Sequence, residues 1–220
     1  MIEIVSVNVG QPQWLRSERG DVETGFIKTP VDGPVYLSKE NLAGDRQADM
    51  KNHGGIDKAV CVYSYDHYHY WERELGIQLE ASAFGENLTV RGLTEADVCI
   101  GDVFQLGGAV VQVSQPRQPC YKIARVHKLE NLPQRVQQTG YSGFYFRVLE
   151  EGHVSKHSRL VVKERHKSGV SIAFANQTMY HDKENQQALK KLVNVEELAA
   201  SWKKPLLQRL EKLEANETQS

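Results

Sequence analysis

One cysteine of this 220-residue chain lies where a thiol would be reactive. Cys120 follows Pro116 and Pro119, and these prolines separate an apolar, strand-like run from a segment with helical spacing. A thiol at a helix start faces the positive end of the helix dipole, and Arg117 and Lys122 add two nearby cations. Both effects lower the pKa of a cysteine toward the thiolate, which attacks substrates or binds metals. These neighbours favour a functional thiol over the alternative, a small buried core residue.

Further polar residues cluster at predicted turns. A glycine pair lets the backbone approach a ligand closely, and one pair here lies among titratable side chains. That run comprises His53, Gly54, Gly55, Asp57 and Lys58. Asn87, in the turn 84–88, could donate to a ligand, although an ordinary turn asparagine fits that position equally well. Lys28 and Arg46 would form an electropositive pocket with Lys58, Arg117 and Lys122 only if the fold brings them together.

Histidine chemistry supplies a rival interpretation. His53 or His127 could activate Cys120 as a hydrolase nucleophile, but the chain has no local hydrolase motif. His67 and His69 are two residues apart on a predicted helix, so they point in different directions. That spacing does not suit a zinc site.

Composition restricts the choice of function. A net charge of −1 gives no general attraction to nucleic acid or to anionic membranes. Cys61, Cys99 and Cys120 are too few and too irregularly spaced for a disulfide framework, a zinc site or an iron–sulfur cluster. Neither a signal peptide nor an apolar stretch long enough to span a bilayer is visible. We therefore expect a cytoplasmic protein that does not bind membranes or nucleic acid polymers.

The first three quarters of the chain predict a mainly β domain with some helices, an α+β class. Short β-rich runs occupy residues 2–7, 25–28, 35–37, 59–63, 87–90, 103–106, 109–113 and 159–163. Helical spacing marks residues 65–75, 120–126 and 132–138. Many short strands with few helices favour a barrel-like domain, which we assign to residues 1–166.

The remainder, residues 167–220, predicts a small helical domain joined at Ser168 and Gly169. Apolar stripes mark three or four short helices over 171–180, 183–193, 195–202 and 204–213. Their mixed charges disfavour a helix-turn-helix DNA reader. Packing against the β domain or a partner subunit is the better expectation, so a homodimer is possible.

The order of these motifs resembles the MOSC domain, a family named for the C-terminal domain of molybdenum cofactor sulfurase. The matching segments are Gly44–Gln47, His53–Gly55 with Asp57 and Lys58, Phe84–Leu88, Ile100–Asp102 and Gln115–Lys122. The tail, with Val170–Ala173 and Leu198–Trp202, resembles the three-helix extension of the YiiM-like branch. Each motif alone is loose, but together they cover almost the whole chain.

This resemblance implies a β-barrel-like fold that binds a molybdopterin cofactor, with Cys120 as the molybdenum ligand. It implies contacts to the pterin phosphate or its polar edge from Lys28, Arg46, Arg117 and Lys122. Gly54 and Gly55 would let the chain pass close to the cofactor. His53, Asp57 and Asn87 would hydrogen-bond cofactor or substrate.

The implied activity is reduction of N-hydroxylated compounds, such as 6-hydroxylaminopurine, to amines. The sequence lacks an iron–sulfur cysteine set and a dinucleotide-binding glycine motif, so a separate flavin or iron–sulfur reductase would supply electrons. Two alternatives remain open. Cys120 could carry a persulfide as a sulfur carrier, or the chain could bind and deliver molybdopterin without turnover.

Overall fold

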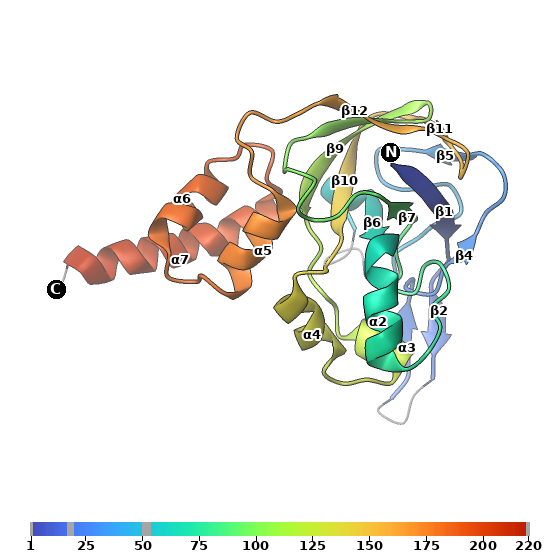
Figure 1. The fold of residues 1–220 in the computed structure, drawn as a ribbon, viewed down its shortest axis with the longest axis horizontal. Helices are drawn as coiled ribbons and strands as arrows, with labels where there is room; N and C mark the ends of the chain where they lie inside the picture. The colour runs from blue at the N-terminus through green and yellow to red at the C-terminus, as the bar shows by residue number, and fades with distance from the viewer. Residues whose placement is uncertain (1, 17–19, 50–53, 219–220) are drawn as a thin grey trace.

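A curled, eight-stranded sheet forms the larger part of the protein (Figure 1). The computed structural model describes residues 2–16, 20–49 and 54–218. In sheet order the strands are β12 (Leu160–Glu164), β8 (Val103–Leu106), β9 (Ala109–Pro116), β10 (Phe144–Glu150), β6 (Val60–Ser64), β7 (Leu88–Arg91), β1 (Glu3–Val9) and β4 (Thr29–Pro30). Neighbours are antiparallel except β6 and β7, which are parallel. The half-barrel confirms the predicted barrel-like α+β fold.

Two short sheets complete the β structure. They pair β2 (Gln13–Leu15) with β3 (Val22–Thr24), and β5 (Val35–Leu37) with β11 (Gly152–Val154). The predicted strand over 25–28 is wrong. The Thr24 hydroxyl accepts a hydrogen bond from the Phe26 amide at 3.0 Å, which turns the chain after β3. Gly25 then passes so close to the Arg46 carbonyl that a β-carbon would collide with it.

Alternation along β6 builds two apolar regions. Val60 and Val62 face the main core inside the curled sheet, where Phe144 and Phe146 of β10 also pack. Tyr63 faces the opposite way, into a separate cluster that includes Trp71. Every residue of β6 is buried, so polar side chains on this strand lie within the protein.

Short helices lie in the connections of the chain between β5 and β10. They are η1 (Ile56–Lys58), η2 (Tyr65–His67), α2 (Tyr68–Leu75), α3 (Lys122–His127) and α4 (Leu132–Thr139). The predicted helix at 120–126 begins later, at Lys122, and has only six residues. Cys120 therefore precedes the helix. Its carbonyl accepts a hydrogen bond from the Ile123 amide in a tight turn that leads into α3.

The C-terminal helices project from one side of the sheet (Figure 1). They are α5 (Ile172–Tyr180), α6 (Gln186–Val193) and α7 (Ala200–Thr218). The helix predicted over 195–202 is wrong for residues 195–199, which form turns, and its end joins the helix predicted over 204–213 because α7 continues through Pro205. Within the described residues, no helix is both long and apolar enough to cross a bilayer. The domain boundary at residue 166 stays a prediction.

Candidate functional site

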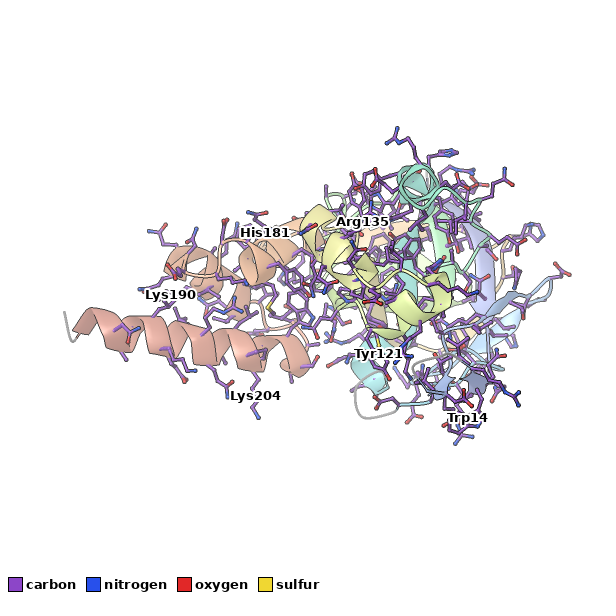
Figure 2. All side chains as sticks on the ribbon, turned by 90° about the horizontal axis from the view of Figure 1, so that it is seen from below. Trp14, Tyr121, Arg135, His181, Lys190 and Lys204 are labelled. Atoms are coloured by element: carbon purple, nitrogen blue, oxygen red, sulfur yellow. The ribbon has the colours of Figure 1, made fainter. Side chains whose placement is uncertain are left out.

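A pocket opens beside Cys120, between the sheet and the loops at its edge. It is lined by Thr24, Gly25, Phe26, Lys28, Gln47, Ala48, Asp49, Lys58, Cys61, Gly85, Asn87, Arg117, Gln118, Cys120, Lys122 and Tyr145. Tyr121, the residue after Cys120, is 56% exposed, and Trp14 on the β2–β3 hairpin is 68% exposed. Both point outward along the same side of the protein (Figure 2).

The sheet supplies a second thiol and a phenol to this pocket. Cys61 of β6 lies opposite Tyr145 of β10 in the antiparallel register, so the two side chains share a face. They are 6% and 8% exposed. Burial raises the pKa of Cys61, although the Arg117 charge acts to lower it. Burial and the neighbouring Cys61 likewise raise the pKa of Tyr145. Both groups are therefore protonated at neutral pH.

Asn87 reaches the pocket, yet its amide joins three strands. Its Oδ1 accepts from the Cys61 amide at 3.0 Å, and its Nδ2 donates to the Asn8 carbonyl at 3.2 Å. Both ends of the side chain are thus engaged within the protein. Its main role here is to hold β1, β6 and the start of β7 together.

Glu86, the neighbour of Asn87, stabilises the same turn through its side chain. Its carboxylate is fully buried and accepts four hydrogen bonds. The donors are the Tyr68 hydroxyl at 2.5 Å, the Thr89 hydroxyl at 2.7 Å and the amides of Ser82 and Phe84 at 3.1 Å each. Because all four donors serve one carboxylate, the turn 82–89 is a fixed edge of the pocket.

Four cations line the pocket, and three of them have internal contacts. Lys28 forms an ion pair with Asp45, with both side chains almost completely buried. The Lys122 ammonium donates to the Glu23 carbonyl at 2.8 Å. Lys58 is half-buried, and this burial lowers its pKa against the opposing charges of Asp57 and Asp49.

Arg117 is the exception. It is only 7% exposed, and no described residue forms an ion pair with its guanidinium or accepts a hydrogen bond from it. The Phe26 ring lies beside it, with its centroid 5.9 Å from the guanidinium carbon. Burial acts to lower the pKa of Arg117, but the nearby Cys61, Tyr145 and Glu86 outweigh this effect and raise it. A largely buried cation that forms no ion pair with a described residue can bind an anion strongly, because the surrounding protein screens the attraction little. The arrangement therefore suits an anionic ligand.

The structure brings together five of the predicted site residues and separates others. Lys28, Asn87, Arg117, Cys120 and Lys122 line the pocket. Arg46, Gly54, Gly55 and Asp57 do not line it. His53 lies outside the described residues.

Asp57 and Arg46 have other surroundings. Both Nε and Nη2 of Arg147 contact the Asp57 carboxylate, at 2.9 and 2.8 Å. The Asp57 carbonyl accepts from the Ser114 hydroxyl, which ties the η1 turn to β9. Arg46 is exposed, and its amide donates to the Gly10 carbonyl at 3.0 Å.

Sequence reasoning did not place Cys61, Tyr145 or Phe26 in the site. Only the cross-strand register brings Tyr145 beside Cys61. The alternation Val60, Cys61, Val62 could have indicated that Cys61 points away from the main core. Phe26 carried no comparable signal.

Of the two histidines that could activate Cys120 in a hydrolase, His53 lies outside the described residues and His127 is engaged elsewhere. His127 Nε2 contacts the Ala83 carbonyl at 2.7 Å and lines a neighbouring pocket instead. His67 pairs with the buried Glu95 carboxylate at 2.6 Å. Among the described residues, no three or more His, Cys, Asp or Glu side chains gather into a group able to hold a metal by themselves.

A half-barrel with this thiol-containing, cation-lined pocket is the architecture of a MOSC domain protein. Residues 49–161 match the MOSC domain, and residues 170–213 match the YiiM-like, 3-alpha helix domain. The chain belongs to the MOSC family, in its YiiM-like branch.

Relatives agree with this assignment. The chain is 50% identical over 210 residues to YflK of Bacillus subtilis, covering 96% of this chain and 95% of YflK. It is 44% identical to the crystal structure of YiiM from Geobacillus stearothermophilus, covering 96% and 100% of the two chains with a TM-score of 0.82. A protein named Reductase from Gibberella moniliformis is 35% identical over 150 residues, which are 66% of this chain and 27% of that protein.

Proposed function

We propose that this protein is a molybdenum-cofactor-dependent reductase that converts N-hydroxylated compounds, such as 6-hydroxylaminopurine, to amines. The observation that carries the proposal is Arg117, a buried cation that lacks a protein partner among the described residues and lies in the pocket of Cys120. Family membership supports the cofactor, and the relative named Reductase supports an oxidoreductase.

The residues present fit a molybdopterin. A cysteine sulfur is the soft ligand that suits molybdenum, and Cys120 lies at the pocket wall. Guanidinium and ammonium groups suit a phosphate, and the pocket holds Arg117 with Lys58 and Lys122. When bound, the cofactor supplies the two-electron chemistry that cleaves the N–O bond.

The protein's own residues bind and orient. Cys120 would hold the metal, while Arg117 would bind the anionic part of the cofactor in a largely desolvated setting, where the attraction is strong. Asn87 and Glu86 fix the pocket edge through their internal hydrogen bonds. Tyr145 is protonated beside Cys61 and could donate a hydrogen bond into the pocket.

We propose that electrons come from a separate flavin or iron–sulfur protein. The sequence has three widely spaced cysteines and no dinucleotide-binding glycine motif, so it carries no evident redox relay of its own. The matched segment makes up 27% of the Gibberella protein, so most of that protein lies outside the segment that resembles this chain.

The decisive experiment measures molybdenum, pterin and activity in one set of variants. Wild-type protein loaded with cofactor should reduce 6-hydroxylaminopurine with a chemical reductant. Cys120→Ala should abolish reduction and lower the molybdenum content. Cys99→Ser is the matched control, because Cys99 is a half-buried thiol outside the pocket, and it should behave as wild type. Unimpaired reduction by Cys120→Ala would disprove the assignment.

The same preparations test the two alternatives. Sulfane sulfur on Cys120 without metal would favour a sulfur carrier. Stoichiometric cofactor without turnover, whatever the electron donor, would favour a delivery module. Molybdenum near one per chain together with turnover supports the reductase.

A further inference from the structure

A second cavity lies at the junction of the MOSC domain and the helical extension. Its volume is about 220 Å³, and it shares no lining residue with the Cys120 pocket. The lining comes from η2, the loop 94–96, the end of α4 with the residues that follow it, and α5. The lining residues are His67, Thr94, Glu95, Ala96, Gln138, Thr139, Gly140, Tyr141, Ala173, Asn176, Gln177 and His181. Ligand sites are common at such domain junctions.

Glu95 fixes one ring nitrogen of His67 in the wall of this cavity. His67 is 7% exposed and Glu95 is 4% exposed, and His67 Nε2 lies 2.6 Å from Glu95 Oε2. The other carboxylate oxygen, Oε1, accepts a hydrogen bond from the Gly143 amide at 2.7 Å. The Tyr141 ring stacks on the imidazole, with the ring centroids 3.8 Å apart and an angle of 9° between the planes. These contacts set both the position and the rotation of the imidazole.

The second ring nitrogen of His67 is left for a ligand. Because a carboxylate oxygen only accepts hydrogen bonds, Nε2 donates to Glu95, and Nδ1 of the uncharged ring is then an acceptor. No described residue forms a hydrogen bond with Nδ1. A carboxylate that holds an imidazole in one tautomer makes the opposite nitrogen a fixed acceptor. His67 therefore offers a preset acceptor to the cavity that it lines.

Asn176 of α5 adds a second acceptor to the same wall. The residue is 2% exposed, and its Nδ2 donates to the Gly140 carbonyl at 3.1 Å and to the Ser142 hydroxyl at 2.8 Å. Its Oδ1 is buried and has no hydrogen-bond partner among the described residues. Buried side-chain oxygens are nearly always hydrogen-bonded, and leaving one unpaired is costly. The unpaired oxygen therefore indicates a donor that comes from outside the protein.

The rest of the lining disfavours a charged ligand. The described lining residues include no lysine, arginine or aspartate, and both oxygens of the Glu95 carboxylate are already engaged. The hydroxyls of Thr94 and Thr139 donate to other parts of the protein, so they do not satisfy the two acceptors. Gln138 and Gln177 are exposed at the rim, where their side-chain amides can donate to a carbonyl.

We infer that this cavity is a second ligand site, which binds a small, uncharged primary amide. The N–H groups of the amide donate to His67 Nδ1 and Asn176 Oδ1, and its carbonyl accepts from the glutamine side chains at the rim. A ligand without N–H groups leaves both acceptors unsatisfied, and an anion finds neither a guanidinium nor an ammonium group in the described lining. The inference goes beyond the proposed reductase activity and does not depend on it, because the two pockets share no lining residue.

Titrations of isotope-labelled, full-length wild-type protein with acetamide and with acetone test the inference by NMR. The two probes have the same shape and the same carbonyl, but acetone has a methyl group where acetamide has its N–H donors. Acetamide should shift the resonances of His67 Nδ1 and of the Asn176 side chain in a saturable way, with a Kd of about 1 to 10 mM for so small a ligand. Acetone and acetate should bind at least about tenfold more weakly, because neither supplies an N–H donor. Equal affinity for acetamide and either of the other probes, or no saturable shift with acetamide, would overturn the inference.

Ala173→Leu tests the location of the site. Ala173 lies on α5 in the cavity wall, so a larger side chain there occupies space that the ligand needs, while leucine remains a good helix former. This variant should bind acetamide at least about tenfold more weakly than wild type, by the same NMR titration. Ala215→Leu, on the exposed face of α7, is the matched control and should bind acetamide as wild type does. Wild-type affinity in Ala173→Leu would show that acetamide binds elsewhere and would overturn the assignment to this cavity. The comparison of acetamide with acetone uses wild-type protein alone, so it decides the question even if Ala173→Leu does not fold.

Discussion

The Cys120 pocket has two walls built in different ways. The sheet wall consists of Cys61, Asn87, Arg117 and Tyr145, which lie on or next to β6, β7, β9 and β10. The loop wall consists of residues 24–28, 47–49, Lys58 and Lys122, which lie outside the strands of the main sheet. The walls differ in what fixes their side chains.

Strand pairing and buried hydrogen bonds hold the sheet wall. Asn87 bridges β1 and β6, and Cys61 pairs in register with Tyr145. The loop wall depends on individual tethers, such as the ion pair of Lys28 with Asp45 and the contact of Lys122 with the Glu23 carbonyl. A fixed wall can hold Arg117 at a constant position for the anionic part of a ligand, while tethered loops leave the opposite side of the pocket adjustable.

Glu86→Gln should have the largest effect, because it breaks the anchor of the sheet wall. The carboxylate accepts four hydrogen bonds in a fully buried site, and an amide there would turn one acceptor into a donor facing other donors. We expect the free energy of unfolding to fall by about 3 kcal/mol in urea titrations. Glu211→Gln, on the exposed face of α7, should change it by less than about 0.5 kcal/mol. Similar values for the two variants would contradict a fixed sheet wall.

Arg117→Met, in the sheet wall, should change the stability of cofactor-free protein in the opposite direction to a substitution in the loop wall. Removing a buried cation without a described partner should leave cofactor-free protein as stable as wild type or about 1 kcal/mol more stable. Affinity for inorganic phosphate should fall by about tenfold or more, because a charge-assisted hydrogen bond is lost. Calorimetry measures the affinity and thermal melts measure the stability.

Lys122→Met is the matched loop variant. It removes the tether to the Glu23 carbonyl, so cofactor-free protein should lose about 1 kcal/mol of stability. If Arg117→Met destabilised the free protein as strongly, Arg117 would have an internal partner, and the anion argument would fail.

The sheet wall was more predictable from the sequence than the loop wall. Short β-rich runs predicted β6, β8 and β9 within a few positions, because buried strands select β-branched and other apolar residues. The strand expected at 25–28 was wrong because a threonine side chain and a close backbone approach, which no periodicity reports, turn the chain there. Candidate residues in loops, such as Arg46 and Asp57, depend on long-range placement. Tyr145 and Cys61 likewise become neighbours only through strand register.

Alkaline pH should lower the free energy of unfolding through buried thiol and phenol groups on and around β6 and β10. Burial raises the pKa values of Cys61, Tyr63, Tyr68 and Tyr145 in the folded protein. Above pH 9 to 10 the unfolded chain releases these protons while the folded protein keeps them, so the free energy of unfolding falls as pH rises. Each group contributes a slope of about 1.4 kcal/mol per pH unit in that range.

Tyr145→Phe removes one such group from the sheet wall. Its stability should fall less steeply between pH 10 and 11 than that of wild type, by about 1.4 kcal/mol per pH unit in urea titrations. Tyr121→Phe is the control, because Tyr121 is exposed, and it should keep the wild-type slope. Equal slopes for all three proteins would show that the buried phenol does not govern alkaline stability.

The smallest predicted effect concerns the hydrogen bonds between the C-terminal helical region and β9. The Ser201 hydroxyl of α7 donates to Gln115 Oε1 at 2.8 Å, and the Ala199 amide donates to the Ser114 carbonyl at 3.0 Å. Both acceptors lie on β9, a few residues before Cys120. The C-terminal helices therefore hold the strand that leads to the thiol.

Ser201→Ala should lower the free energy of unfolding by about 1 kcal/mol, since one partly buried hydrogen bond is lost. Alkylation of Cys120 in cofactor-free protein should change by about twofold to fivefold, because a strand with one support fewer holds the thiol less firmly. Ser201→Thr retains the hydroxyl and should restore the wild-type alkylation rate. If Ser201→Ala lost stability without any change in alkylation, the helices would stabilise the fold but would not position Cys120. The rigidity of the sheet wall would then come from the strands alone.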